Sequence, residues 1–226
     1  MWVKICANTS LEDTQLAADA GADAVGFVFA ESVRQVTPAQ VRAITPKLPS
    51  QIEKYGVFVD AGFEEIARIV DECGLTGVQL HAANDPALPS RLREHFSKPL
   101  RILKVIHYGG DLETQVRGAQ SDPAIDAVLV DSRTATLVGG TGRKFDWEAA
   151  SGSLRSAGSH LRIVVAGGLN PDNVADAIRA LRPWGVDVVT GVEAAPGRRD
   201  PSKLKAFVEN ARIAATKAKL EVPVKA

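Results

Sequence analysis

The sequence RIVVAGGLNPDNVADAIRALRPWGVDVVTGVE, residues 162–193, carries the pattern that predicts the fold most clearly. It contains an apolar run at 162–165, a two-glycine turn, a segment of helical periodicity at 171–181, and a second apolar run at 187–189 that a glycine again follows. Two short β-rich runs separated by one helical segment are typical of parallel strands joined by a crossover helix. The stretch therefore predicts two strands of a parallel sheet, each followed by a glycine turn.

The same alternation repeats along the rest of the chain. The expected strands are the runs at 3–6, 24–29, 54–59, 77–80, 101–106, 127–130, 162–165 and 187–189. The expected helices lie near 10–20, 38–47, 62–73, 86–96, 112–120, 146–156, 171–181 and 201–217. Helix caps are expected at Thr37, Asn170, Asp200, Gly21 and Gly74. Eight strands alternating with eight helices predict an α/β protein with a single (β/α)8 barrel, the TIM barrel.

An open doubly wound sheet would use the same alternation. Such a sheet usually places a glycine-rich phosphate loop after its first strand. Here the first strand runs into Cys6-Ala7-Asn8-Thr9, and the glycines cluster after the last strands. The position of the glycines therefore favours the barrel.

Length and composition set the broad class. The chain has 226 residues, 45% apolar and 24% charged, which suits one globular domain. We expect a barrel catalytic domain at 1–216 and a frayed C-terminal tail at 217–226. The 27 basic and 27 acidic residues cancel, which argues against nucleic acid or an anionic membrane as a partner. Without a signal peptide or a long apolar run, a cytoplasmic protein is expected, with Cys6 and Cys73 as free thiols.

Glycine-rich loops follow the last three expected strands. Glycine lets the backbone approach an anion closely, and a helix N-terminus favours negative charge. TIM barrels place their phosphate site after the last two strands, so these loops predict a phosphate cradle, although each alone could be a simple tight turn. The loop after the sixth strand could form a lid over the same site. The phosphate-binding candidates are Gly140, Gly142, Gly167, Gly168, Thr190 and Gly191.

Polar residues at the carboxyl ends of barrel strands point into the mouth, where such enzymes hold their catalytic groups. Cys6 ends the first strand and Asp131 follows the sixth, so their side chains should face each other across the mouth. A thiolate and a protonated carboxylic acid can move a proton within a sugar phosphate. A buried structural thiol and a turn-forming aspartate are the alternatives.

Several segments, taken in order, resemble the phosphoribosylanthranilate isomerase family over nearly the whole chain. They are Val3-Lys4-Ile5-Cys6, Ser32-Val33-Arg34-Gln35-Val36, Gly56-Val57-Phe58-Val59, Val78-Gln79-Leu80-His81, Val128-Leu129-Val130-Asp131-Ser132, Gly140-Thr141-Gly142 with Phe145-Asp146-Trp147, Gly185-Val186-Asp187 with Gly191-Val192-Glu193, and Ala195-Pro196-Gly197-Arg198-Arg199-Asp200. Each segment alone is weakly specific, but their shared order identifies the family.

The resemblance implies an Amadori rearrangement in tryptophan biosynthesis, without cofactor or metal. N-(5-phosphoribosyl)anthranilate becomes 1-(2-carboxyphenylamino)-1-deoxyribulose 5-phosphate. By the same resemblance, Asp131 is the general acid on the furanose ring oxygen and Cys6 is the general base on the sugar C2 proton. Arg34 matches the family's arginine for the anthranilate carboxylate, which its planar fork suits. Asp187 is assigned to substrate binding, with neutralisation by a core partner as the alternative.

The general base needs help, because a free thiol is only a few per cent thiolate at neutral pH. Strand alternation places Lys4 on the same face as Cys6 at an unknown distance, and Lys4 is not expected to supply that help. His81 is interpreted as a structural hydrogen-bonding group. Ala7 and Ala82 stand where the family usually has glycine, so any positive φ there would be strained. Thr190 replaces the family's common serine and keeps a hydroxyl group.

Other phosphate-binding barrels remain as alternatives. A pentose-phosphate epimerase would need metal-ligating side chains at several strand ends, which the four scattered histidines do not supply. The Lys and Glu constellation of indole-glycerol-phosphate synthase is not found, and a catalytically silent sugar-phosphate-binding barrel would not need both Cys6 and Asp131. The expected partner is a small phosphorylated substrate. The sequence leaves open a monomer or a homodimer and acceptance of the analogous histidine-pathway substrate.

Overall fold

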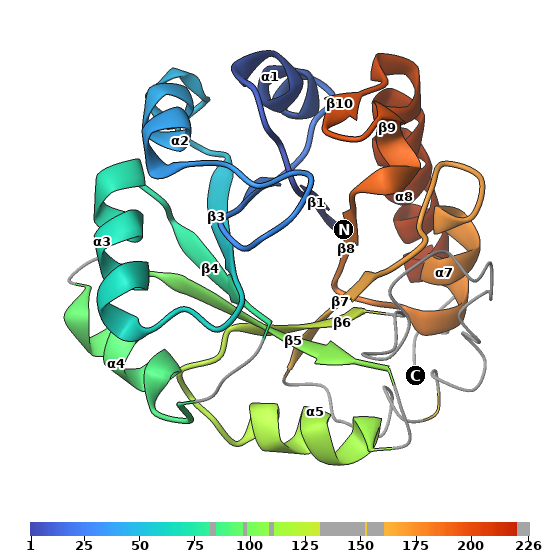
Figure 1. Ribbon diagram of the computed structural model, residues 1–226. Helices are drawn as coiled ribbons and strands as arrows, with labels where there is room; N and C mark the ends of the chain where they lie inside the picture. Colours follow the sequence, from blue (N-terminus) through green and yellow to red (C-terminus); the bar gives the residue numbers. More distant parts are fainter. Residues whose placement is uncertain (82–84, 97–98, 109–110, 132–151, 153–160, 221–226) are drawn as a thin grey trace.

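The computed structural model describes residues 1–81, 85–96, 99–108, 111–131, 152 and 161–220. Eight parallel strands, β1 to β8, pair in sequence order, and β1 also pairs with β8, so that the sheet closes. In Figure 1 the strands surround the centre of the molecule and the helices lie outside them. The predicted (β/α)8 barrel is confirmed.

The strands lie where the apolar runs predict them. Their bounds are β1 (Trp2–Ile5), β2 (Ala24–Val28), β3 (Glu53–Phe58), β4 (Gly77–Leu80), β5 (Arg101–His107), β6 (Ala127–Asp131), β7 (Arg162–Ala166) and β8 (Gly185–Val188). The largest difference is at β8, which begins at Gly185 instead of Asp187. The two extra residues pair with β1 through Trp2 and Val3.

The helices also agree with the periodicity. They are α1 (Leu11–Asp19), α2 (Pro38–Ile44) with the 3-10 turn η1 (Thr45–Lys47), α3 (Phe63–Cys73), α4 (Leu88–His95), α5 (Leu112–Gln120), α7 (Val174–Leu181) and α8 (Pro201–Leu220). The helix expected at 146–156 lies outside the described residues apart from Gly152. Because α8 continues past residue 217 and the chain after 220 is not described, the division into barrel and tail stays a prediction. No helix within the described ranges is long and apolar enough to cross a membrane.

Local hydrogen bonds explain where several helices begin and end. Thr37 and Gln40 form a capping box before Pro38, and the Asp200 carboxylate accepts the backbone N–H groups at 202 and 203. Gly74 ends α3 in the left-handed region, with φ 59°. The expected start of α7 after Asn170 is wrong by three residues. The Asn170 side chain accepts the N–H groups at 172 and 173 in a turn, and the helix begins at Val174.

A short antiparallel hairpin follows the barrel and was not predicted. It consists of β9 (Glu193–Ala195) and β10 (Arg198–Arg199), and the 3-10 turn η2 (Thr190–Val192) connects it to β8. Its bend contains Gly197 at φ 77°, whose carbonyl oxygen accepts from Thr9 Oγ1 at 2.8 Å. The hairpin therefore packs on the loop after β1 and brings Glu193 and Arg199 to the carboxyl end of the barrel.

Two apolar clusters lie on the two sides of the sheet. The larger combines strand residues such as Val3 and Ile5 with helix residues such as Leu204, so it fills the space between strands and helices. The smaller contains only strand residues, among them Trp2, and fills the barrel interior. Side chains alternate along a strand, so Lys4 points into the interior above Trp2, and Cys6 follows at the mouth.

Candidate active site

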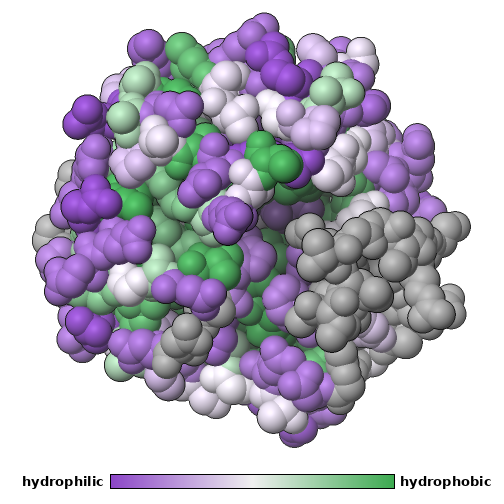
Figure 2. Space-filling view, in the orientation of Figure 1, coloured by the Kyte–Doolittle hydropathy of each residue, from purple (hydrophilic) through white to green (hydrophobic). Residues whose placement is uncertain are grey.

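A cavity of about 340 Å³ lies at the carboxyl ends of the barrel strands. Its polar or ionisable lining residues are Cys6, Glu31, Ser32, Arg34, Gln79, His81, Asp131, Asp187 and Thr190, and its apolar ones include Val28, Val57, Val59 and Leu129. Figure 2, in the orientation of Figure 1, shows hydrophilic and hydrophobic residues beside one another around the central hollow. This is the end of the barrel at which TIM-barrel enzymes carry their sites.

Cys6 and Asp131 both line this mouth cavity, from opposite sides of the barrel. Cys6 follows β1 and Asp131 ends β6, three strands away in one direction and five in the other. Each residue is about 3% exposed, so both are largely shielded from bulk water. The structure thus brings together the two residues that the sequence singled out as an acid/base pair.

The backbone that presents Cys6 is held on several sides. Its N–H donates to the Val188 carbonyl oxygen at 3.0 Å, and its own carbonyl oxygen accepts from the Arg199 guanidinium. Ala7, the next residue, has φ 62°, so the strain anticipated for a non-glycine residue here is present. Asn8 holds the turn by donating to the Gly26 carbonyl oxygen at 3.2 Å. Ala82, the second such position, lies outside the described residues.

Lys4 forms the centre of a buried polar group beneath the cavity. Its Nζ atom lies 2.8 Å from Asp187 Oδ1 and 2.8 Å from Gln79 Oε1, and the side chain is fully buried. Burial lowers the pKa of the Lys4 ammonium, but Asp187 and Cys6 together outweigh this effect and raise it. Burial raises the pKa of Asp187, and the charge of Asp131 adds to that rise while Lys4 opposes it. Asp187 therefore has a core partner and also lines the cavity, and its assignment to substrate binding stays a prediction.

The expectation that Lys4 does not assist Cys6 is wrong. Burial raises the pKa of the Cys6 thiol, and Lys4 lowers it by charge and by hydrogen bonding. Gly26 of β2 makes room for the pair, because a Cβ there would lie 2.6 Å from Cys6 Sγ and 3.2 Å from Lys4 Cε. Alternation along β1 correctly places Lys4 and Cys6 on the same face of the strand. It cannot predict that the two side chains lie close together, because this depends on the absence of a side chain at Gly26.

His81 lies at the rim of the same polar group. Its Nε2 atom is 3.1 Å from Gln79 Nε2, and its ring centroid is 6.1 Å from that of His107. Gln79 thus joins Lys4 to His81. The structural interpretation of His81 fits this contact, although the side chain also lines the cavity.

The glycine loops after β7 and β8 lie against each other. Gly167 and Gly168 have φ of 87° and 66°, which favour glycine. A Cβ on Gly191 would lie 1.9 Å from the Leu169 carbonyl oxygen, so only glycine allows this contact. Within the described chain, no hydrogen bond uses the backbone N–H of Gly168, Thr190 or Gly191. The loops therefore keep main-chain donors for a ligand. Gly140 and Gly142 lie outside the described residues.

Arg34, which follows β2, also lines the cavity, and Glu193 holds its guanidinium. Arg34 Nε lies 2.7 Å from Glu193 Oε1, and Arg34 Nη2 lies 2.6 Å from Glu193 Oε2. The Gly197 N–H also donates to Glu193, at 3.0 Å. A guanidinium has five N–H donors, so the bidentate pair fixes its plane and leaves donors for another anion. Sequence reasoning missed this role of Glu193, because the pair spans 159 positions and depends on the hairpin.

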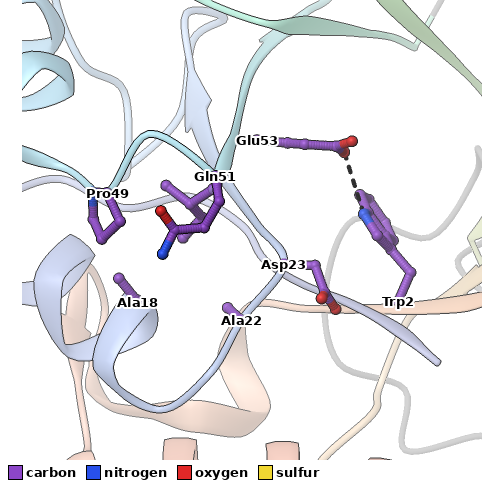
Figure 3. A pocket seen from close by; sticks show the side chains of 8 residues that line it. Trp2, Ala18, Ala22, Asp23, Pro49, Gln51 and Glu53 are labelled. Carbon is purple, nitrogen blue, oxygen red and sulfur yellow. Dashed lines mark hydrogen bonds between the residues drawn. The ribbon is translucent and has the colours of Figure 1, made fainter.

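A second cavity, of about 370 Å³, lies at the opposite end of the barrel. Figure 3 shows Trp2, Asp23 and Glu53 on its walls, with Trp2 Nε1 donating to Glu53. Its two carboxylates are already engaged, since Asp23 accepts from the Val3 N–H and from Arg212, and Glu53 accepts from Trp2 and Tyr55. The amino ends of barrel strands serve stability in this fold. The smaller mouth cavity is the candidate active site.

A closed barrel with ionisable side chains and glycine loops around one mouth cavity defines the class of (β/α)8-barrel enzymes. The comparisons with known proteins identify the family. The family model described as N-(5'phosphoribosyl)anthranilate (PRA) isomerase matches residues 3–210. The chain belongs to this family and is an isomerase of tryptophan biosynthesis.

Individual relatives agree along the whole barrel. The chain is 43% identical to N-(5'-phosphoribosyl)anthranilate isomerase of Pelobacter propionicus, with 93% of this chain and 95% of that protein covered. It resembles a phosphoribosyl anthranilate isomerase in complex with reduced 1-(o-carboxyphenylamino)-1-deoxyribulose 5-phosphate, at 33% identity, TM-score 0.79, and 94% and 98% coverage. It also resembles monomers generated from the dimeric enzyme of Thermotoga maritima, at 34% identity, TM-score 0.78, and 94% and 98% coverage.

Proposed function

We propose that this isomerase converts N-(5-phosphoribosyl)anthranilate into 1-(2-carboxyphenylamino)-1-deoxyribulose 5-phosphate with Asp131 as general acid and Cys6 as general base. The observation that carries the assignment is the placement of these two side chains on opposite walls of one cavity. A sugar between them can receive a proton on one side and lose a proton on the other.

Asp131 acts first. Its carboxylic acid donates a proton to the furanose ring oxygen, the bond from C1 to that oxygen breaks, and the nitrogen lone pair forms an iminium. The near-complete burial of Asp131 supports a group that works without bulk water.

Cys6 acts second. Its thiolate removes the proton from the sugar C2, the electron pair forms the C1–C2 double bond, and the iminium is neutralised to an enolamine. The enolamine then tautomerises to the ketone product, so the overall reaction is an isomerisation and needs no oxidant. Asp187 lines the cavity while its Oδ1 atom accepts from Lys4, and it would accept a further hydrogen bond from a sugar hydroxyl.

The two charged ends of the substrate fit different walls. The N–H groups of Gly168, Thr190 and Gly191, with Gly167 giving the turn its shape, would hold the phosphate. Arg34 would bind the anthranilate carboxylate with the donors that Glu193 leaves open. Gly140 and Gly142 complete the proposed phosphate site on sequence grounds alone.

The proposal includes the setting of the enzyme. The substrate is a small phosphorylated molecule, the reaction takes place in the cytoplasm, and neither nucleic acid nor a membrane takes part. The chain acts as a monomer or a homodimer, and the dimeric Thermotoga maritima relative supports the second form. Sedimentation of the purified protein distinguishes the two.

Complementation tests the function. A tryptophan auxotroph that lacks this isomerase should grow without tryptophan when it expresses the chain, and freshly formed phosphoribosylanthranilate should be consumed by the purified protein. The Asp131→Asn variant, expressed to the same level, is the matched control and should restore neither growth nor turnover. Failure of the parent chain in both assays would refute the proposed function.

A further inference from the structure

Lys4 is a fully buried ammonium that does not reach the cavity itself. Its neighbours Cys6, Gln79 and Asp187 line the cavity floor, and Lys4 lies behind them. Below it, the Tyr55 ring centroid is 5.9 Å from Nζ, so the ammonium rests on the aromatic layer of the barrel interior. Burying a lysine ammonium is costly unless the charge is paired, and an apolar side chain could replace a lysine whose role was only to fill space.

Two acidic groups are close enough to use the single positive charge of Lys4. Asp187 holds it at 2.8 Å, and the Cys6 thiol lies beside its Cε atom across the gap that Gly26 leaves. Gln79 provides a neutral acceptor that fixes the ammonium between them. When Cys6 loses its proton, a second negative charge forms next to Asp187, and Lys4 is the buried cation in direct contact with that carboxylate.

We propose that Lys4 is a positioning residue for the general base, with its ammonium shared between Asp187 and the Cys6 thiolate. The inference rests on the proposed role of Cys6. Its consequence is that the charge state of Asp187 controls the base. A substrate hydroxyl that donates to Asp187 releases part of the ammonium's attraction to the thiolate, so that substrate binding favours the basic form of Cys6.

The charged groups that face Cys6 come from several elements. Lys4 lies on the same strand, Asp187 on β8, and the Arg199 guanidinium of β10 binds the Cys6 carbonyl oxygen. Lys4 and Arg199 favour the thiolate and Asp187 opposes it, while burial favours the thiol more than any of them. Removing Lys4 and Asp187 together should therefore shift the thiol titration upward, because the thiolate loses the ammonium that lies beside it across the gap at Gly26.

The test is the pH midpoint of Cys6 alkylation by iodoacetamide, measured without substrate. The chain has two cysteines, so a Cys73→Ala background leaves Cys6 as the only thiol. The midpoint reports the protonation of the thiol independently of how easily the reagent enters. Lys4→Met/Asp187→Asn replaces the buried pair with neutral groups of similar size, which usually preserves folding. Its midpoint should lie above that of the background protein.

Asp187→Asn alone should lower the pH midpoint of Cys6 alkylation. The Lys4 ammonium then no longer pairs with a carboxylate and interacts with the Cys6 thiolate instead. A one-unit difference between this variant and the double variant corresponds to about tenfold slower alkylation at a fixed neutral pH. Lys54→Met is the matched control. Lys54 is another buried lysine, but it donates to the Ile52 carbonyl oxygen at the amino end of β3, so its loss should leave the midpoint unchanged.

Equal midpoints in Asp187→Asn and in the double variant would overturn the proposal, as would a midpoint of the double variant at or below that of the background. A purely structural role for Lys4 would change the melting temperature without this shift. Because the titration needs no turnover, its failure is distinguishable from failure of the proposed function, which complementation reports separately.

Discussion

The two ends of the mouth cavity are built from different chemical groups. At the ends of β1, β6 and β8 the walls are buried ionisable side chains, Cys6, Asp131 and Asp187. After β7 and β8 the walls are glycine loops, in which the N–H groups of Gly168, Thr190 and Gly191 have no protein partner within the described chain. A group that must gain and lose a proton has to be a titratable side chain, whereas a permanent anion is held best by donors that never titrate. Substitutions at the first end should therefore change turnover, and those at the second should change affinity.

Asp131→Asn should show the largest effect. The amide keeps the shape of the side chain but cannot donate the carboxylic proton, so kcat should fall by at least the roughly 100-fold typical of losing a positioned acid. Steady-state kinetics on freshly formed substrate measure the change, and the melting temperature of the variant checks its fold. A kcat within a few-fold of the parent would remove Asp131 from the acid role.

Gly191→Ala should act on affinity. A Cβ at this position would lie 1.9 Å from the Leu169 carbonyl oxygen, so the loops after β7 and β8 must separate. The KM and the inhibition constant of inorganic phosphate should both rise by about tenfold or more, the equivalent of about 1.4 kcal/mol of binding, while kcat changes less. Gly118→Ala, in α5 with nothing within 4 Å of the added Cβ, is the control and should change neither constant. A drop in kcat without a rise in KM or in the phosphate inhibition constant would contradict the expectation that the glycine loops determine affinity and not turnover.

Arg34→Met tests the proposed binding of the anthranilate carboxylate by Arg34. It keeps much of the side-chain bulk and removes a charge-assisted pair worth about 1.5–3 kcal/mol, so kcat/KM should fall by roughly 10- to 150-fold. The phosphate inhibition constant should stay the same, because Arg34 follows β2 and the glycine loops follow β7 and β8. A parallel loss of phosphate affinity would move Arg34 to the phosphate end.

Glu193→Gln is the companion variant. It retains one acceptor for the Arg34 fork but loses the charge that fixes its plane, so its effect on kcat/KM should be smaller and in the same direction. An effect larger than that of Arg34→Met would show that Glu193 acts through something other than Arg34.

Ala7→Gly should give the smallest effect. Ala7, next to Cys6, adopts φ 62°. In the glycine loops the same left-handed region is occupied by glycine, as at Gly168 with φ 66°. Relief of the left-handed strain, less the added entropy of the unfolded chain, should raise the free energy of unfolding by about 0.5–1 kcal/mol. Urea denaturation measures it. Asp60→Gly, at φ 56°, is the control and should gain less, because aspartate tolerates this region better. A lower free energy of unfolding for Ala7→Gly would show that the backbone at Ala7 is not strained.

The sequence predicted the parts that depend on local patterns. The barrel follows from apolar runs and helical periodicity, and the glycine loops follow from their position after the last strands. The strain at Ala7 was anticipated from the family comparison. Contacts between distant segments could not be predicted in this way: the Arg34–Glu193 pair depends on an unpredicted hairpin, and the Lys4–Cys6 contact depends on the space at Gly26. Such contacts are set by how the strands pack together, which periodicity does not encode.

Cys6 is proposed to act in the chemical step, and the glycine loops are proposed to bind phosphate. Measuring kcat and the phosphate inhibition constant on the same preparation of Cys6→Ala separates these two roles. We expect kcat to fall by at least about 100-fold, because the C2 proton loses its base, and the phosphate inhibition constant to stay unchanged. A kcat within a few-fold of the parent, or a phosphate affinity that weakens in step with kcat, would contradict this separation of roles.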